Sequence, residues 1–195
     1  MITNINQLDF SKKYTYADYM TWQFKERVEL IKGYVFKISP APNMNHQRIS
    51  SEIHGNIWSF LKSKPCQVFH APFDVRLPVS PNSDKKTNTV LQPDITVVCD
   101  ESKLDKQGCN GAPDLVIEIL SPGNTKREMK DKLEIYEYSG IPEYWLVDPE
   151  REFVIIYSLN DQGKYIGSVP FTDEEILKSK KLKGFKLDLS EIFIH

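Results

Sequence analysis

Residues 113–138, PDLVIEILSPGNTKREMKDKLEIYEY, contain the pattern that decides the fold of this chain. An apolar run, LVIEIL, is interrupted only by Glu118, and an amphipathic helical pattern follows it after the short loop SPGNT. A second apolar run, EYWLVD (143–148), comes after the helix. Strand, helix and strand in this order predict a βαβ unit with parallel strands, and therefore an α/β protein.

One lysine of that helix lies on its apolar side. If Met129 is set at zero and each residue advances about 100°, Leu133 lies near 40°, Tyr136 near 340° and Lys132 near 300°. The helix should pack this apolar arc on the sheet, so we expect the Lys132 amine to point at the strand that carries Glu118. The alternative is that Lys132 extends to the surface from the edge of the arc, as long cationic side chains often do.

A second acid, Asp94, stands at the start of another strand-like run, PDITVV (93–98). Carboxylates buried on neighbouring strands are costly unless a cation pairs with them. Mg²⁺ and Mn²⁺ prefer oxygen ligands, and Mg²⁺ usually takes only one or two protein carboxylates together with water. Asp94 and Glu118 therefore predict a divalent-metal site suited to cutting a phosphodiester, with Lys132 beside it.

The other elements are predicted from capping and periodicity. Thr15 and Asp18 have the spacing of a capping box before a short helix. Apolar residues at 49, 53, 57, 60 and 61 predict a long helix that ends near residue 64. Strands are expected in RVELI and YVFKI as a hairpin around Lys32-Gly33, in 66–79 on both sides of Pro72, in EFVIIYSL and KYIGSVPF as a second hairpin, and in KGFKLDLSEIF.

Bulk composition indicates one globular domain over residues 1–195, with 40% hydrophobic and 27% charged residues. The net charge of −2 argues against a protein that coats nucleic acid, so any contact with DNA should be local. Candidate cations for such contacts are Lys126, Arg127 and Lys130, then Lys85 and Lys86, and finally the tract 178–186, which equally fits a solvated face.

The three cysteines, Cys66, Cys99 and Cys109, have no CxxC spacing, so we expect neither a disulfide framework nor a zinc ribbon, and a reducing cytoplasm fits best. No export signal is apparent, and no apolar run approaches the ~18 residues of a membrane span. The motifs GxGxxG, GxxxxGK[ST], HExxH and GxSxG are absent from the sequence. No nucleotide cofactor is therefore expected.

The elements ELIKG, a helix-opening His46, QPDITVV, PDLVIEILSPGNT, Lys132 with Tyr136, and SGIPEYWLVDP together resemble the Uma-type family of restriction-endonuclease-like proteins. That family lies within the PD-(D/E)xK nuclease superfamily, and the resemblance covers residues 15–165. It implies a restriction-endonuclease-like mixed central β-sheet flanked by α-helices, with additional β-hairpins. It also implies a Mg²⁺- or Mn²⁺-dependent DNA endonuclease. Many superfamily members work as pairs, which leaves a homodimer open.

The resemblance assigns roles to particular residues. Asp94 matches the Asp of the superfamily motif, and Glu118 matches its acidic residue. Leu120 occupies the position where many relatives have lysine, so the lysine looks relocated to Lys132 on the helix. Glu29 resembles the extra acid that the first element often supplies.

We expect the metal to be held by Asp94, Glu118 and the main-chain carbonyl of Ile119, with Glu29 joining directly or through water. A water activated by the metal would attack phosphorus, while the metal neutralises charge on the phosphate oxygens. Lys132 would orient that water or stabilise the transition state. A lysine beside two carboxylates keeps its charge, which favours the stabilising role over that of a base.

His46 lies in the apolar stripe of its helix, so it is either a core or helix-start histidine or a partner of a phosphate or of Glu29. Asp114 either begins its strand or supports the metal ligands. Glu128 stands where the family commonly has Asp, which keeps the charge and changes the reach. Five residues are thus further candidates for supporting the metal or binding phosphate: His46, Asp114, Glu128, Lys126 and Arg127.

Two other functions stay open. A catalytically silent module on the same fold would use the site for nucleic-acid binding or interaction, and the low net charge favours it because nucleases generally present a basic surface. A structural or interaction protein would instead hold its acids in salt bridges to Lys126, Lys130 and Lys132. RNA is an alternative to DNA as the substrate.

Overall fold

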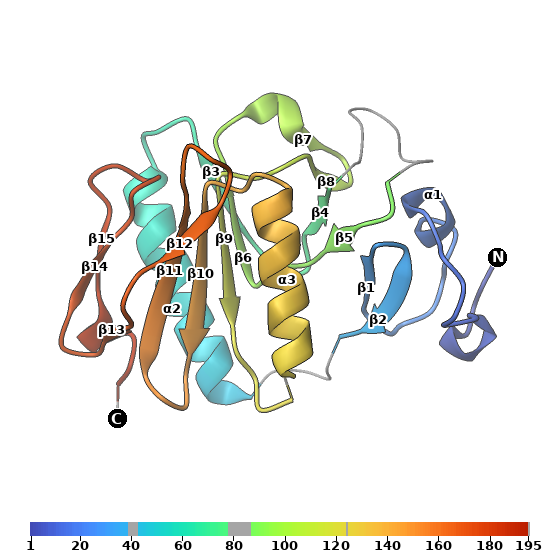
Figure 1. Cartoon of the computed structure of the whole chain (residues 1–195), viewed down its shortest axis with the longest axis horizontal. Coiled ribbons are helices and arrows are strands. Elements are labelled where there is room, and N and C mark those ends of the chain that lie inside the picture. The colour runs from blue at the N-terminus through green and yellow to red at the C-terminus, as the bar shows by residue number, and fades with distance from the viewer. Residues whose placement is uncertain (39–42, 78–86, 124, 195) are drawn as a thin grey trace.

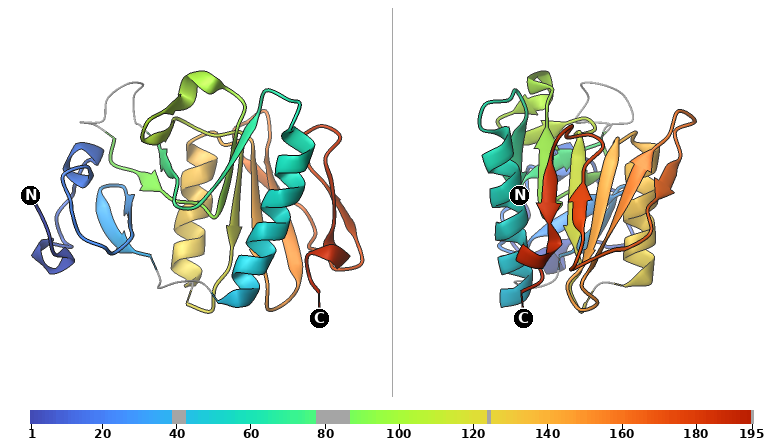
Figure 2. Two further views of the ribbon diagram at one scale, coloured as in Figure 1. Left: turned by 180° about the vertical axis from the view of Figure 1, so that it is seen from behind. Right: turned by 90° about the vertical axis from the view of Figure 1, so that its left-hand side faces the viewer.

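The structure is a computed structural model that describes residues 1–38, 43–77, 87–123 and 125–194. A central sheet has α2 (Met44–Leu61) behind it and α3 (Lys126–Tyr138) in front, and a second sheet lies to one side, toward the N-terminus (Figure 1). Figure 2 shows the two helices on opposite faces of the central sheet. The predicted mixed sheet flanked by helices is confirmed.

The central sheet has seven strands in the order β12-β11-β10-β9-β6-β3, with β13 paired to β11. β9 and β10 are parallel, and the other neighbours are antiparallel. The βαβ unit predicted around α3 is therefore confirmed. The bounds are β3 Gln67–His70, β6 Ile95–Val98, β9 Leu115–Ile119, β10 Glu143–Asp148, β11 Phe153–Leu159, β12 Tyr165–Gly167 and β13 Phe171–Thr172.

The second sheet has six strands in the order β2-β1-β5-β4-β8-β7. Its first two strands form the predicted hairpin, which turns at Lys32 and Gly33 with positive φ angles of 53° and 90°. The predicted capping box of Thr15 and Asp18 opens α1 (Tyr16–Tyr19). The bounds are β1 Val28–Ile31, β2 Tyr34–Lys37, β4 Asp74–Arg76, β5 Val90–Leu91, β7 Leu104–Asp105 and β8 Gly108–Asn110.

The remaining described elements are short. β14 (Ile176–Lys178) and β15 (Lys186–Asp188) pair as a two-stranded sheet, so the predicted C-terminal strand is confirmed. Three single 3₁₀ turns complete the set: η1 Ile5–Gln7, η2 Glu101–Lys103 and η3 Leu189–Glu191. Within the described part of the chain, no helix is both long and apolar enough to span a membrane.

Alternation along β9 divides the core between the two helices, because successive side chains of a strand point to opposite faces. Leu115, Ile117 and Ile119 pack with the isoleucines of α2 in one core cluster. Val116 packs with residues of α3 in a second cluster. Glu118 is two residues after Val116, so its side chain points to the same face of the strand. Strand periodicity therefore places this acid beneath α3.

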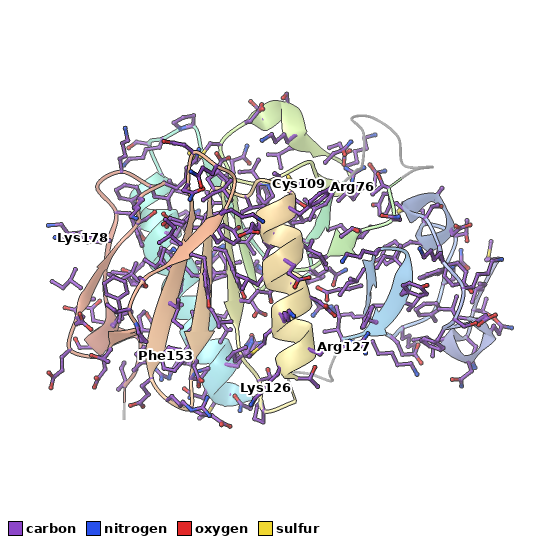
Figure 3. All side chains as sticks on the ribbon, in the orientation of Figure 1. Arg76, Cys109, Lys126, Arg127, Phe153 and Lys178 are labelled. Atoms are coloured by element: carbon purple, nitrogen blue, oxygen red, sulfur yellow. A yellow bond between two sulfur atoms is a disulfide. The ribbon has the colours of Figure 1, made fainter. Side chains whose placement is uncertain are left out.

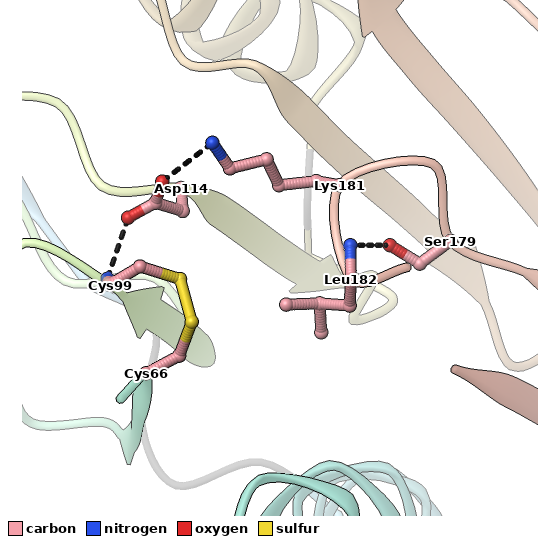
Figure 4. The surroundings of a disulfide bond; sticks show 6 residues. All are labelled: Cys66, Cys99, Asp114, Ser179, Lys181 and Leu182. Atoms are coloured by element: carbon pink, nitrogen blue, oxygen red, sulfur yellow. Dashed lines mark hydrogen bonds and ion pairs between the residues drawn. A yellow bond between two sulfur atoms is a disulfide. The ribbon is translucent and has the colours of Figure 1, made fainter. Parts of the chain in front are cut away.

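Cys66 and Cys99 form a disulfide (Figure 4), while Cys109 is free and buried. The expectation of no disulfide is therefore wrong. The two cysteines flank the antiparallel pair of β3 and β6, in which Gln67 lies opposite Val98. They are 33 residues apart in the chain, and only the pairing of these strands brings them together.

Glu143 at the start of β10 is 1% exposed, yet its carboxylate is fully hydrogen bonded. Oε1 accepts from Trp145 Nε1 at 2.7 Å and from Ser179 Oγ at 2.8 Å. Oε2 accepts from the main-chain N–H groups of Lys180 and Lys181 at 2.8 and 2.9 Å. These four donors compensate the buried charge and fasten the segment after β14 to the central sheet.

Glu143→Ala should lower the free energy of unfolding by about 3 kcal/mol or more, because it leaves several buried donors without an acceptor. The matched control Glu150→Ala changes an exposed acid in the turn after the same strand and should stay within about 0.5 kcal/mol of wild type. Urea denaturation followed by tryptophan fluorescence measures both. Equal stabilities of the two variants would contradict the anchoring role of Glu143.

Candidate active site

Glu118 receives two hydrogen bonds from one face of α3. Its Oε1 accepts from Lys132 Nζ at 2.9 Å and from the Tyr136 hydroxyl at 2.5 Å. The two donors are four residues apart, so they lie one helical turn from each other on the same side. The side chains of Lys132 and Glu118 are each only 12% exposed. The predicted direction of Lys132 is therefore confirmed, and its extension to the surface is not observed.

Glu29 reaches the same amine from the other sheet. It lies in β1, its side chain is 5% exposed, and its Oε1 is 3.2 Å from Lys132 Nζ. The same oxygen accepts the main-chain N–H of Gln92 at 2.9 Å. Lys132 thus bridges two glutamates that come from two different sheets.

Asp94 completes the acidic group. β6 and β9 are antiparallel, with Ile95 opposite Ile117. Continued by one residue, this register sets Asp94 opposite Glu118 on the neighbouring strand. Directly opposed like charges destabilise a sheet unless a cation compensates them. The Asp94 Oδ2 atom also accepts the Ile119 main-chain N–H at 2.8 Å.

His46 belongs to this cluster as well. Its main-chain N–H binds the Asn43 side chain that caps α2, so it is a helix-start histidine. Its Nε2 lies 3.0 Å from the Ile119 carbonyl oxygen and 3.3 Å from Asp94 Oδ2. A partnership with Glu29, one of the two predicted roles, is not formed, because the sheet crossing puts Asp94 closer to the start of α2. Its Nδ1 is buried and has no hydrogen-bond partner among the described residues.

The charges of the cluster shift the pKa values of its members. Burial raises the pKa of Glu118 to about 7, and the negative charges of Asp94 and Glu29 act in the same direction. Burial alone would lower the pKa of Lys132, but Glu118 and Glu29 outweigh it and raise that pKa, so the amine stays charged. Burial and the Glu118 charge hold the pKa of Tyr136 well above its usual value, so its hydroxyl stays a donor.

For His46, burial opposes protonation, but the contacts with Asp94 and the Ile119 carbonyl outweigh it and raise the pKa. Three carboxylates, those of Glu29, Asp94 and Glu118, therefore surround one permanently charged amine and one imidazole. The cluster carries more acidic than basic groups. It is an environment that attracts a further cation.

Two carboxylate oxygens of the cluster are available to such a cation. Oε1 of Glu118 and Oδ2 of Asp94 are engaged as described above. Within the described residues, no hydrogen bond is made to Oε2 of Glu118 or to Oδ1 of Asp94. Among these residues, no three His, Cys, Asp or Glu side chains converge closely enough to hold a metal ion unaided. A metal would therefore need a main-chain oxygen and water to complete its ligands.

Asp114 lies apart from the cluster. It stands four residues before Glu118, about 13 Å along β9. Its Oδ2 accepts the Cys99 main-chain N–H at 2.6 Å, and its Oδ1 is 2.8 Å from Lys181 Nζ (Figure 4). Of the two predicted roles, Asp114 thus has that of a strand start, and support of the metal ligands is not observed.

The other predicted residues lie in the first turn of α3 (Figure 3). Lys126 is exposed. The side chain of Arg127 is 87% exposed, and its Nε lies 3.8 Å from Asp131 Oδ2. Glu128 donates its main-chain N–H to the Thr125 hydroxyl that caps the helix. These cations are on the surface near the carboxyl end of β9, where they could meet a phosphate.

The salt-bridge alternative is only partly realised. That alternative named three lysines. Lys132 pairs with the acids of the cluster, whereas Lys130 Nζ lies 3.8 Å from Glu134 Oε1 on the surface of α3. The lysines of the tract 178–186 are exposed, as in a solvated face, and the residues Ser179, Leu182 and Phe185 between them are buried. Lys85 and Lys86 lie outside the described residues.

Two contacts of the cluster were not assigned a role from the sequence. Helical spacing could have assigned the hydroxyl of Tyr136 to Glu118, because it stands one turn after Lys132. No local signal links Gln92 to Glu29, since 63 residues separate them. That contact depends on how the two sheets meet.

Comparisons with known proteins identify the family and the fold. Residues 16–190 match the Uma2 family model, described as "Putative restriction endonuclease". A crystal structure of "a putative nuclease belonging to DUF820" from Anabaena variabilis ATCC 29413 has a TM-score of 0.68 at 21% identity, covering 92% of this chain and 97% of that chain. An uncharacterized protein of Synechocystis sp. (strain PCC 6803) is 22% identical over 152 residues, 76% of each chain.

The structural likeness confirms the predicted fold class. The family model covers most of the chain, and the residues that suggested the resemblance lie within the matched range. The protein belongs to the Uma2 family of restriction-endonuclease-like proteins.

Proposed function

We propose that this protein is a Mg²⁺- or Mn²⁺-dependent endonuclease that hydrolyses phosphodiester bonds of DNA. One observation carries the proposal: the Lys132 amine is held between Glu29 and Glu118, beneath a helix, with Asp94 opposite Glu118 in the sheet register. A structural salt bridge needs one acid for each base. Here three carboxylates lie around a single lysine, in a family whose model is described as "Putative restriction endonuclease".

The residues present fit a hard divalent cation. Asp94 and Glu118 would hold it, with the Ile119 carbonyl as a main-chain ligand and Glu29 reaching it through water. Two carboxylates with water are the usual protein share of a Mg²⁺ site. Burial raises the pKa of Glu118 to about 7, with Asp94 and Glu29 acting in the same direction, and a cation bound to the carboxylate would lower that pKa. When bound, the metal would neutralise charge on the phosphate and lower the pKa of water.

The protein's own groups would do the rest. Lys132 stays charged beside Glu118, so it would stabilise negative charge on a phosphate oxygen rather than act as a base. Lys132 and Tyr136 both bind Oε1 of Glu118 and so fix the orientation of that carboxylate. His46 holds the Ile119 carbonyl and Asp94 together from the start of α2.

The substrate contact would be local. The net charge of −2 gives no general attraction to DNA, but Lys126 and Arg127 are exposed in the first turn of α3. Phosphates on either side of the scissile bond would meet these cations. The same net charge favours one second candidate, a silent nucleic-acid-binding module, which would bind metal and DNA without cutting.

Mn²⁺ binding measured by calorimetry tests the site. Wild type should bind, and Asp94→Asn and Glu118→Gln should each weaken binding by about 100-fold or more, as loss of a charged ligand does. The matched control Asp114→Asn changes an acid of the same β9 region that contacts Cys99 and Lys181 instead, and its affinity should equal that of wild type. Failure of wild type to bind Mn²⁺ would remove the metal site.

Cleavage of plasmid and single-stranded DNA in Mn²⁺ tests the chemistry. Lys132→Met should lower kcat by about 10²–10³-fold, because a charge that stabilises the transition state is lost. Its Mn²⁺ affinity should change by less than about tenfold, since the loss of a donor that orients Glu118 is offset by the removal of a cation that competes for the acids. Lys62→Met, an exposed lysine at the end of α2, is the control. Equal activity in every preparation would indicate a contaminating nuclease, and DNA binding without cleavage would favour the silent module.

Tyr136→Phe should reduce Mn²⁺ affinity by about tenfold while the fold is kept, because Glu118 loses the hydroxyl that orients it. Tyr138→Phe makes the same change at a tyrosine that is 90% exposed and serves as the control. Calorimetry on both variants, with circular dichroism to verify the fold, measures the effect. Identical affinities would show that the 2.5 Å hydrogen bond does not position the carboxylate.

A further inference from the structure

The acids of the candidate site come from two sheets, and the chain crosses between these sheets at residues 92–94. β5 belongs to the six-stranded sheet and β6 to the seven-stranded sheet, and Gln92, Pro93 and Asp94 connect them. Glu29 lies in the six-stranded sheet, and Glu118 lies in the seven-stranded sheet. The relative placement of the acids therefore depends on whatever fixes the crossing.

Gln92 makes contacts on both of its sides. Its main-chain N–H donates to Glu29 Oε1 at 2.9 Å, on the oxygen that also faces Lys132. Its side-chain Nε2 donates to Asp74 Oδ1 in β4 at 2.8 Å and to the Tyr19 hydroxyl in α1 at 3.2 Å. The side chain thus ties the crossing to two elements of the N-terminal region.

The amide oxygen of Gln92 is used as well. It accepts from Arg27 Nε at 3.0 Å and from Arg27 Nη2 at 2.8 Å, just before β1. A glutamine amide has two donor hydrogens and one oxygen with two lone pairs, so its full capacity is satisfied. Three elements around Glu29 hold this one side chain in place: α1, β4 and the residues before β1.

We propose that Gln92 is a positioning residue of the site: its side chain anchors the crossing, and the anchored main chain holds Glu29 by hydrogen bond and Asp94 two residues further on. Gln92 touches no reacting atom and acts through these acids. The effect of Gln92 on metal binding and cleavage rests on the proposed function. A displacement of about 1 Å in a preorganised site is enough to cost about 10²-fold in rate.

A double-mutant cycle tests the positioning without any metal. The melting temperatures of Glu29→Gln, Lys132→Met and the double variant give the coupling between these two side chains. The same cycle in a Gln92→Ala background should show the coupling reduced by about half or more, because the main-chain N–H that binds Glu29 is no longer anchored by the side chain of residue 92. An unchanged coupling would overturn the inference.

A swap of donor and acceptor tests the side chain itself. Gln92→Glu sets a carboxylate against Asp74, and adding Asp74→Asn restores a donor–acceptor pair in the reverse direction, with Arg27 still able to bind the new acid. Mn²⁺ affinity should fall about tenfold in Gln92→Ala and in Gln92→Glu and recover to within about threefold in the double variant. A merely structural role would lower melting temperatures and leave the affinities unchanged.

Gln7→Ala is the matched control, since the Gln7 side chain is also hydrogen bonded, to the main chain of Thr3 and Asn4 in the N-terminal segment. It should leave Mn²⁺ affinity at the wild-type value. If wild type binds no Mn²⁺, the proposed function fails, and the coupling between Glu29 and Lys132 still decides the role of Gln92. If wild type binds Mn²⁺, but the substitutions of Gln92 change neither the coupling between Glu29 and Lys132 nor the Mn²⁺ affinity, the positioning inference alone fails.

Discussion

The ion pairs of Lys132 with Glu29 and Glu118 are the interaction on which the arrangement of this protein depends. The amine is nearly out of contact with solvent, and it joins α3, the central sheet and the second sheet at one point. A buried amine is stable only when acids compensate its lost hydration. Here the compensation exceeds the need, because Asp94 adds a third carboxylate across the register from Glu118. The remaining negative charge is what the proposed metal ion would compensate.

Two glutamates on adjacent parallel strands show how surroundings decide what a buried acid does. Glu143 and Glu118 lie in β10 and β9, and each is largely buried. Glu143 receives four hydrogen bonds spread over both oxygens, so its charge is satisfied by the fold and anchors a distant segment. Glu118 receives two, both on Oε1, and faces other acids. The first is a structural carboxylate, whereas the second retains capacity for a ligand.

The site is assembled where the chain passes from one sheet to the other. Glu29 arrives from β1, Asp94 follows the crossing, and His46 arrives from the start of α2. Each is fixed by a main-chain partner: the Gln92 N–H for Glu29, the Ile119 N–H for Asp94 and the Ile119 carbonyl for His46. The Ile119 groups move with the central sheet, and the Gln92 N–H moves with the connection between the two sheets, so the geometry of the acids depends on how the sheets are joined.

The sequence by itself determined the longer helices and strands and the direction of Lys132 and Glu118, because strand and helix periodicities are local and fix the face on which each side chain lies. The start of the strand-like run PDITVV added Asp94 to this group, and the family resemblance added Glu29. The short strands β5, β7 and β8 were not predicted. Only the tertiary structure decided that His46 pairs with Asp94, that Asp114 turns to Cys99 and Lys181, and that Cys66 joins Cys99. These contacts depend on strand order and register between segments far apart in the chain, which no local pattern specifies.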